Sequence, residues 1–463
     1  MLRSTILFSL LLTLVSCGQA PEPLFTPGPR RIIVISLDTL GAKHLESYGY
    51  YRETSPNISA VARAGCRFSN ATAPSNWTLP SHASLFTGLY PARHGVREKH
   101  QILDDVPAHL VESLRDAGFA TAGFTGGAYL NAHFGLDRGF DHYQSEQEWE
   151  HSTNETLTKA KQWLGGHRDH DVFLFLHTYE IHAPYTAPPQ YARLFTSNPR
   201  SQFQGLIVQL QEMKKKESLR PQDIQVVIDR YDAGIAYTDD MLGEFLAWLA
   251  EEQLDSNMLL IISSDHGEEF WEHGDHSHGG DLLGNEVTQV PLIIRLPDGS
   301  GAGAVVAEEV SFLDIMPTVL DAVGVSRPHG LDGFSLMPEL AGWPVKDIDS
   351  EARQRRQYQP DRPGHGVGIC EGDRFVAAQT RHWKALTTYP GVAFPGHDLW
   401  PALFDLQADA AELAPLPPDD AMFRRLADAV ERLVGNGRAR RDSLTDATEV
   451  DATTRRQLEA LGY

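Results

Sequence analysis

Four polar residues stand at positions where they could assemble a site for metal-assisted chemistry. Asp38 ends the apolar run 31–37, and Asp265 with His266 follow the apolar run 258–262. Thr78 stands where a helix is expected to begin. Three oxygens and one imidazole suit Mn²⁺, Mg²⁺, Ca²⁺ or Zn²⁺. A hydroxyl bound to such an ion loses its proton more easily and becomes a nucleophile near neutral pH.

The segment 75–82 predicts a helix that starts close to Thr78. Pro80 suits the first helical turn, and Gly88 can end the helix after Thr87. An oxygen at a helix N-terminus lies among free backbone N–H groups, which favours a tetrahedral anion. The alternative is that Thr78 only caps its helix, as threonine commonly does.

Histidines add possible proton donors and ligands. His182 lies in the loop after the predicted strand 172–176 and can donate to a bridging or leaving oxygen. Three more histidines, at 273, 276 and 278, occupy the segment that follows Asp265 and His266. These three are candidates for a second metal site, and a mobile surface loop is the alternative.

Alternating apolar runs and amphipathic stretches predict the elements that position these side chains. The strands expected at 31–37, 119–124, 172–176, 258–262 and 290–296 alternate with the helices expected at 56–64, 107–117, 224–249 and 312–323. This alternation predicts an α/β fold with a large, mostly parallel sheet covered by helices on both faces. Ligands bind such sheets at the carboxyl ends of the strands, where Asp38, His177 and Asp265 are expected.

A second, smaller unit follows the Pro- and Gly-rich stretch 330–363. Short strands at 375–378, 383–388 and 402–406 and a helix at 422–434 predict a small C-terminal α+β domain. The domains are therefore expected at 31–340 for the catalytic unit and 341–463 for the C-terminal subdomain and tail.

Composition narrows the class of protein. The 463 residues carry a formal net charge of −22, which argues against a nucleic-acid partner because nonspecific binding needs basic patches. Beyond the N-terminus no apolar run reaches the ~20 residues of a membrane span. Cys66 and Cys370 are too few for a disulfide framework, and either one bridge or two buried thiols are compatible with the sequence.

The N-terminus is typical of an exported lipoprotein. Arg3 precedes the apolar stretch 6–15, and Leu14-Val15-Ser16-Cys17 resembles the bacterial lipobox, whose cysteine is lipidated. Residues 1–16 are therefore predicted to be a signal peptide, and 17–30 a lipidated cysteine with a Pro-rich linker. The predicted location is the cell envelope, anchored to the membrane through Cys17; a plain secretory signal is the alternative.

The ordered motifs resemble the sulfatase family within the alkaline-phosphatase superfamily. Each motif alone is modest, but their order is specific and extends from about residue 30 to residue 435. The matching segments are 35–40, 54–58, 80–91, 177–185, 231–243, 264–279, 290–297, 314–320, 330–338 and 403–406.

The resemblance implies roles for individual residues. It implies a sulfatase-like fold in which a divalent ion, held by Asp38, Asp265 and His266, also contacts the nucleophile Thr78. His182 would contact the transferred group. His278 stands where many members carry a substrate-binding lysine and is assigned that role. We include His82 among the predicted catalytic residues because it stands where true sulfatases have an arginine.

Two departures from the family pattern bear on the substrate. True sulfatases have Cys or Ser at the Thr78 position, which is oxidised to formylglycine, and threonine cannot give that aldehyde. A sulfated threonine would need water to attack crowded sulfur, whereas a phosphothreonine can be cleared by in-line attack. The family's Lys-x-His segment is also missing around 124–128. Fewer cations suit a less charged substrate, such as a phosphodiester.

The sequence thus predicts a metal-dependent hydrolase of sulfate or phosphate esters that uses Thr78. One alternative is a transferase of the phosphoglycerol or phosphoethanolamine type, or a phosphodiesterase. An alternative of another class is a binding protein that has lost its catalytic activity.

Overall fold

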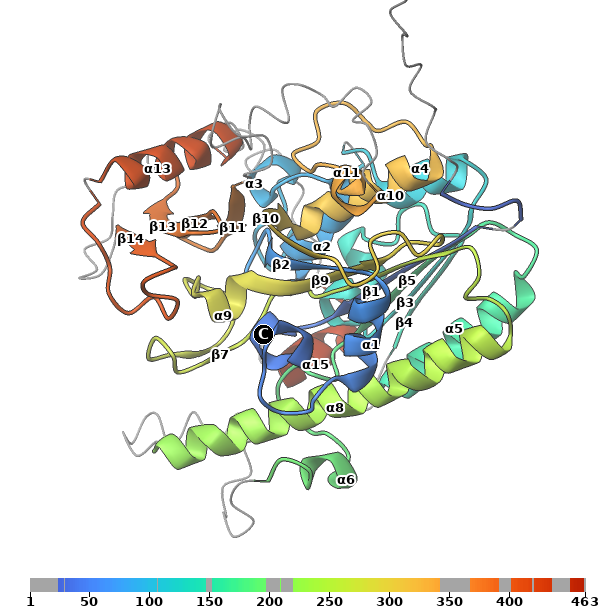
Figure 1. The fold of residues 1–463 in the computed structure, drawn as a ribbon, viewed down its shortest axis with the longest axis horizontal. Coiled ribbons are helices and arrows are strands. Elements are labelled where there is room, and N and C mark those ends of the chain that lie inside the picture. Colours follow the sequence, from blue (N-terminus) through green and yellow to red (C-terminus); the bar gives the residue numbers. More distant parts are fainter. Residues whose placement is uncertain are drawn as a thin grey trace, which may run out of the picture.

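The computed structural model describes residues 24–28, 30–105, 107–146, 152–196, 209, 220–341, 367–390, 401–418, 420–434 and 450–461. The predicted signal peptide and Cys17 lie outside these residues. The described chain forms a large helix-covered sheet and a smaller sheet beside it (Figure 1).

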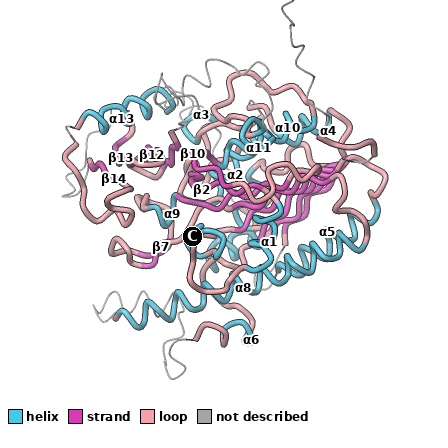
Figure 2. The backbone as a smooth tube through the Cα atoms, in the orientation of Figure 1, coloured by secondary structure: helices cyan, strands magenta, loops and turns pink. Residues whose placement is uncertain are grey.

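The large sheet has eight strands in the order β10-β2-β9-β6-β1-β5-β3-β4. Neighbouring strands run parallel, except that β9 is antiparallel to both β2 and β6. Figure 2 shows these strands side by side through the middle of the molecule. The fold class predicted from the sequence is confirmed. The strands are β1 Arg31–Leu37, β2 Cys66–Thr72, β3 Ala120–Thr125, β4 His142–Ser145, β5 Val172–Thr178, β6 Met258–Ser263, β9 Gln289–Arg295 and β10 Val305–Ser311.

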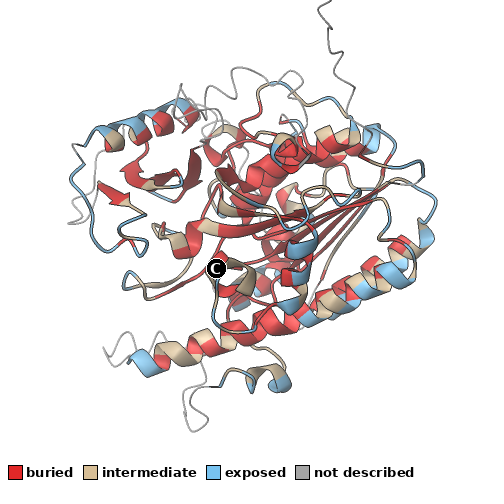
Figure 3. Cartoon of the chain, in the orientation of Figure 1, coloured by how far each residue is buried: buried red, intermediate tan, exposed pale blue. Residues whose placement is uncertain are grey.

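Helices cover both faces of this sheet because its central strands are apolar on both sides. In β1, Ile32 and Val34 pack into one core cluster, while Ile33 and Ile35 pack into the other. The first cluster is closed by α2 Thr78–Thr87, α4 Leu110–Asp116 and α10 Ile315–Val323. The second is closed by α1 Pro56–Ala64, α5 Ser152–Gly166 and α8 Pro221–Glu251. Figure 3 shows the buried strands between the two helical layers.

The smaller unit is an antiparallel sheet of β11 Gly368–Glu371, β12 Phe375–Gln379, β13 Trp383–Thr388 and β14 Ala402–Asp405, with α13 Ala421–Val434 packed on it. The last described helix, α15 Ala452–Leu461, returns to the large unit. There the Gln457 side chain accepts from the Ala128 N–H and donates to the Glu146 carbonyl. The predicted domain junction falls largely within 342–366, outside the described residues, so the boundary at 340 stays a prediction.

Several local expectations need correction. His177 is a residue of β5 and does not follow it, and the helix expected from 107 begins at Leu110. The sequence analysis did not identify β2, β4, β10, β11 or α5. Cys66 and Cys370 are both free and buried, so the alternative of a disulfide between them is wrong. Within the described part of the chain, every helix is too short or too polar to span a lipid bilayer.

Candidate active site

Asp38 leaves the centre of the large sheet through a tightly held turn. Its N–H donates to the Thr178 carbonyl, 3.2 Å away, on the neighbouring strand β5. Thr39 has a φ of 59°, a left-handed conformation that is rare for a β-branched residue. The Tyr231 hydroxyl of α8 donates to the Thr39 carbonyl (2.6 Å) and accepts from the Gly41 N–H (2.9 Å). The strained turn is thus fixed on both sides, and with it the carboxylate of Asp38.

Asp265 and His266 follow β6, the other neighbour of β1. The Ser264 hydroxyl accepts from the Leu40 N–H (3.0 Å) and donates to the His266 carbonyl (2.6 Å), which joins the two strand ends. His266 Nδ1 lies 3.0 Å from the Gly267 carbonyl. A donor bond there leaves Nε2 as the imidazole nitrogen that faces Asp38 and Asp265, as in metal-binding histidines.

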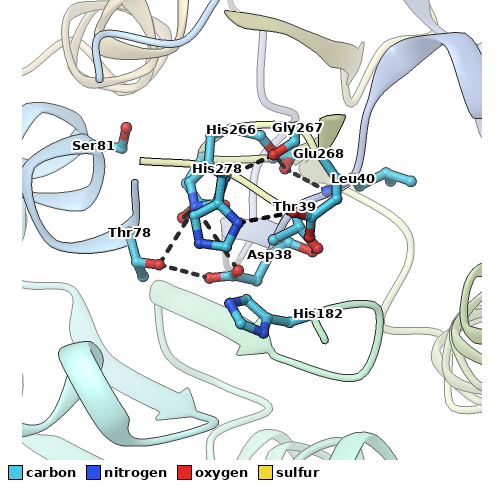
Figure 4. Close-up of polar contacts among 12 residues, drawn as sticks. Asp38, Thr39, Leu40, Thr78, Ser81, His182, His266, Gly267, Glu268 and His278 are labelled. Atoms are coloured by element: carbon cyan, nitrogen blue, oxygen red, sulfur yellow. Dashed lines mark hydrogen bonds and ion pairs between the residues drawn. The ribbon is translucent and has the colours of Figure 1, made fainter. Parts of the chain in front are cut away.

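Thr78 is the first residue of α2, and Trp77 holds the cap position with an extended backbone. The Thr78 hydroxyl donates to Asp38 Oδ2 (3.3 Å) and lies 3.4 Å from His266 Nε2 (Figure 4). The alternative that Thr78 is the cap residue of its helix is therefore wrong. Its hydroxyl is directed at the strand-end acids and imidazole.

The donor set fits a divalent cation. One ligand atom each from Asp38, Asp265 and His266 lies within 4.8 Å of the others. Three buried oxygens, Asp38 Oδ1 and both oxygens of Asp265, have no hydrogen-bond donor. Burial raises the pKa of Asp38 to about 7, and burial together with the neighbouring Asp38 charge also raises the pKa of Asp265. Buried carboxylates without donors need a cation to stay ionised.

Two further histidines, His177 and His82, lie beside these acids. His177 Nε2 lies 3.1 Å from Asp38 Oδ2. His82, one turn into α2, is engaged through both ring nitrogens: Nε2 lies 3.0 Å from Ser36 Oγ, and Nδ1 lies 2.9 Å from the Thr78 carbonyl. Burial lowers the pKa of both imidazoles to about 4. They are neutral groups that hold the cluster in place.

The remaining predicted residues, His182 and His278, lie next to each other beside the cluster. Their rings lie 4.9 Å apart, and the His278 ring is 4.3 Å from that of His266. His182 Nδ1 lies 2.7 Å from the Ala183 carbonyl, and burial lowers its pKa to about 3. The structure thus brings together all seven residues singled out from the sequence: Asp38, Thr78, His82, His182, Asp265, His266 and His278.

Sequence reasoning missed two contributors. His177 was noted only as a strand-end residue, although the register that pairs it with Ser36 on β1 places it against Asp38. Glu268 belongs to the same Asp-His-Gly-Glu run as Asp265 and His266, yet its contact is to His278, with Oε1 3.1 Å from Nδ1. In each case the sequence offered one clue, which is that the residue lies close to a stronger motif.

The loop that carries His278 is fastened to the loop that carries Thr78. The Asn76 amide donates to the carbonyls of Gly280 (3.1 Å) and Leu282 (3.0 Å), and the Gly279 N–H donates to the Asn76 carbonyl. A cavity of about 630 Å³ lies between this loop and the small sheet. Its walls include His278, Arg374 and Phe404.

The three histidines considered for a second metal site have different partners. His278 faces Glu268, and the His276 ring stacks on Trp271 at 4.6 Å between ring centroids. His273 Nε2 instead lies 3.2 Å from Glu286 and 3.9 Å from Glu412.

The cluster around His273 contains carboxylates and lysines, and one ligand atom each from His273, Glu286 and Glu412 lies within 4.8 Å of the others. Lys43 lies 3.4 Å from Glu286 and also pairs with Glu272, and the fully buried Lys384 lies 2.8 Å from Glu412. The arrangement is an ionic link between the large and small units.

Comparison with known proteins agrees with this fold. Residues 30–325 match the sequence model of the sulfatase family. The chain is 24% identical to the multifunctional alkaline phosphatase superfamily protein PehA of Trinickia caryophylli, over 81% of this chain and 88% of the relative.

Solved structures share the fold. The phosphonate monoester hydrolase of Agrobacterium radiobacter superimposes with a TM-score of 0.64 at 22% identity, over 89% of this chain and 96% of that one. BT4656, solved with its substrate D-glucosamine-2-N,6-O-disulfate, gives a TM-score of 0.69 at 18% identity, over 91% of this chain and 100% of that one.

The chain belongs to the sulfatase family, within the alkaline-phosphatase superfamily. It is an ester hydrolase, and enzymes of this family are generally metal-dependent.

Proposed function

We propose that this protein hydrolyses phosphate esters, phosphodiesters above all, with the Thr78 hydroxyl as nucleophile. The observation that carries the proposal is the placement of that hydroxyl, 3.3 Å from Asp38 Oδ2 and 3.4 Å from His266 Nε2. This geometry favours an active enzyme over a binding protein with a decayed site, because a threonine that only begins a helix needs neither the Asp38 carboxylate nor the His266 imidazole as a partner.

Asp38, Asp265 and His266 would hold the divalent cation, with Thr78 beside them. When bound, such an ion lowers the pKa of a neighbouring hydroxyl and neutralises charge on the ester.

In the proposed reaction, Thr78 Oγ1 attacks phosphorus in line with the leaving oxygen while its proton passes to the neutral imidazole of His278. The bond from phosphorus to Thr78 forms, the ester bond breaks, and His278 passes that proton to the leaving alkoxide. His182, held through Nδ1 by a backbone carbonyl, contacts the transferred group. Water then attacks the phosphothreonine and gives a proton to His278, which passes it to the departing Thr78 oxygen. His82 and His177 position the acids without touching the ester.

The choice of phosphorus over sulfur rests on the side chain of the nucleophile. Formylglycine, which true sulfatases carry, is hydrated to two hydroxyls, and the second expels sulfate by elimination. Thr78 has one hydroxyl, so its ester must be cleared by attack of water on the central atom. Water can reach the phosphorus atom of a phosphothreonine for this attack, whereas the sulfur atom of a sulfated threonine is crowded.

Parallel assays on the purified protein test the proposal. Phosphodiester, phosphomonoester and sulfate-ester forms of 4-nitrophenol should show the highest kcat/KM for the phosphodiester. Intact-protein mass spectrometry after rapid acid quenching should detect a phosphorylated form, and peptide mapping should place it on Thr78. Highest activity on the sulfate ester would overturn the choice of substrate.

A matched pair of variants tests the nucleophile. Thr78→Ala should abolish turnover, whereas Thr87→Ala, the same change on the same buried helix, should retain it. The Thr87 hydroxyl only donates to the Ala83 carbonyl, 2.7 Å away. Equal activity of Thr78→Ala and the parent would remove Thr78 from the mechanism. Formation of a new ester when glycerol or ethanolamine is added would instead favour the transferase alternative.

We further propose that the enzyme works in the bacterial cell envelope, held to a membrane through lipidated Cys17. The support is the run of a short positive region, an apolar stretch and Leu14-Val15-Ser16-Cys17.

A further inference from the structure

Tyr179 is a fully buried aromatic residue whose ring packs against two histidines of the candidate active site. It follows β5 directly and is 0% exposed. Its ring lies edge-on, 4.6 Å from that of His177 and 5.7 Å from that of His182, within the range of stabilising aromatic contacts. Its carbonyl accepts from the His182 N–H, 3.0 Å away. Tyr179 therefore contacts both the ring and the backbone of His182, which Figure 4 shows on the loop after this strand.

The same ring packs against the turn 126–128, which joins β3 to a short helix, η3 Ala128–Leu130. A Cβ on Gly126 would lie 2.8 Å from Tyr179 Cδ2, so only glycine lets the turn and the ring approach this closely. Ala128 and Tyr179 form a small buried cluster with Leu461 of α15. The family's Lys-x-His segment is missing around these residues, and the small side chains found there leave room for the Tyr179 ring.

The helix α15 holds this turn through a buried glutamine. Gln457 is 4% exposed; its Oε1 accepts from the Ala128 N–H (3.0 Å), and its Nε2 donates to the Glu146 carbonyl (2.7 Å). Gly127 has a φ of 80° and Ala128 a φ of 48°, and a non-glycine residue keeps such a left-handed conformation only with support from its surroundings. A continuous series of contacts thus leads from the C-terminal helix to His182.

We infer that Tyr179, clamped between the turn 126–128 and the two histidines, is a positioning residue for His182, and that α15 supports catalysis by holding this clamp. The inference rests on the proposed function, since it concerns how His182 is presented to the transferred group. Tyr179 acts through His182, and Gln457 acts through the turn and Tyr179.

The clamp supplies an orientation that the hydrogen bond of His182 does not. The bond between His182 Nδ1 and the Ala183 carbonyl, at 2.7 Å, fixes one edge of the ring but leaves its tilt about that bond open. The edge-on contact with Tyr179 limits the tilt. Orientation of this kind matters because a catalytic group misplaced by about 1 Å can cost about 100-fold in rate.

A matched pair of glycine variants tests the clamp. Gly126→Ala presses a methyl group on the Tyr179 ring. Gly123→Ala is the control on the same strand, because its Cβ would lie 2.7 Å from Tyr143 Cδ2, and the Tyr143 ring packs on Phe140 at 5.1 Å. The two substitutions thus strain the structure in the same way, but only the first strains it next to the histidines. Circular dichroism melts and metal content establish that each variant is folded and loaded.

Kinetics on methyl 4-nitrophenyl phosphate separate positioning from general damage. We expect Gly126→Ala to lower kcat about 10- to 100-fold with KM within about twofold, the range found when a partner that orients a catalytic group is disturbed. Gly123→Ala should keep kcat within about threefold of the parent, although it should melt at a similarly lowered temperature. Equal losses of kcat in the two variants would overturn the inference.

A second pair of variants tests the part played by α15 and decides the question if Gly126→Ala does not fold. Gln457→Leu removes both hydrogen bonds, whereas Glu459→Leu places the same side chain at an exposed position of the same helix. We expect kcat to fall about 5- to 20-fold in Gln457→Leu, with KM unchanged, and to stay within about twofold of the parent in Glu459→Leu. A parent-like kcat in Gln457→Leu would refute the role of α15.

Histidine-selective NMR gives a readout that does not need turnover. The ring current of Tyr179 shifts the Cε1–H resonances of His177 and His182, so Gly126→Ala and Gln457→Leu should move both. The resonance of His44, whose ring contacts Tyr50 and Tyr231, should stay in place. Unmoved resonances of His177 and His182 would contradict the clamp.

The two proposals can fail separately. If Thr78→Ala is as active as the parent, the proposed function fails. If Thr78→Ala is inactive while Gly126→Ala has the same kcat as Gly123→Ala, the proposed function stands and only this inference fails.

Discussion

Replacing Asp38 by Asn should make the metal-free protein more stable while it abolishes catalysis. The carboxylate is fully buried, and its Oδ1 has no hydrogen-bond donor. Burial raises its pKa from 3.8 to about 7. A rise of this size corresponds to about 4 kcal/mol of destabilisation once the group is ionised in the folded protein. Asn carries no charge, so it escapes this cost, but it is a poor ligand for a divalent cation.

The same pKa predicts how the stability of the metal-free parent depends on pH. The folded carboxyl of Asp38 keeps its proton to higher pH than the unfolded one, so between about pH 4 and pH 7 the folded state binds more protons. The free energy of unfolding should therefore fall as pH rises through this window and level off above it. The Asp38→Asn variant lacks this titrating group, so its free energy of unfolding should not fall for this reason between pH 4 and pH 7. Its stability advantage over the parent should therefore be greatest above pH 7.

Urea denaturation of chelator-treated protein at pH 5 and pH 8 measures both effects. Asp314→Asn is the control: Asp314 is equally buried, but its oxygens accept from the N–H groups of Ser311 (2.8 Å) and Phe334 (2.7 Å). An amide would place its own N–H against one of these donors, so this variant should lose about 1 to 3 kcal/mol. If Asp38→Asn also loses stability without metal, the idea that an unpaired buried charge strains the apo site is refuted.

Three further outcomes are expected. Chelation should inactivate the enzyme and one divalent ion should restore it; full activity in protein shown to be metal-free by elemental analysis would exclude the proposed cation site. Gly267→Ala should unfold the site, since its Cβ would lie 2.0 Å from the Glu286 carbonyl oxygen, whereas Gly165→Ala, with nothing within 4 Å, should melt at or above the parent temperature. Cys17→Ser should move the protein from the membrane fraction to the soluble fraction of cells; unchanged fractionation would argue against lipidation.

The central part of the fold could be predicted because its strands are buried on both faces. β1, β5 and β6 are short apolar runs, and a strand covered by helices on both sides requires just that pattern. The strands that the sequence analysis missed contain polar as well as apolar residues. β2 reads Cys-Arg-Phe-Ser-Asn-Ala-Thr and alternates between buried and half-buried positions, so its apolar content is too low to stand out from a loop.

The meeting of Asp38, Asp265 and His266 could be anticipated from a topological rule. Parallel strands deliver their carboxyl ends to the same edge of a sheet, so acids after β1 and β6 had to meet. Sequence alone could not settle how Thr78 was oriented, because a threonine at a helix start can serve as a cap or face away. The tertiary structure decides this question through the contact between Thr78 and Asp38.

The contacts of His82 and His278 depend on packing that no local pattern encodes. His82 was grouped with the catalytic residues because of its place in the motif, yet both its ring nitrogens are taken by Ser36 and the Thr78 carbonyl. His278 depends on Glu268, ten residues earlier, and the two meet only because the chain between them turns back as the short hairpin of β7 Glu269–Phe270 and β8.

The site thus has two layers with different physical origins. The acids, Thr78 and their supporting histidines are fixed by the rigid sheet and α2, and they are fully buried. His278 comes from a hairpin held by hydrogen bonds to Asn76 and Glu268. Substitutions in the first layer should change metal content together with activity. Substitutions in the second should change proton transfer while the metal stays bound, and this difference allows the two groups of residues to be told apart by experiment.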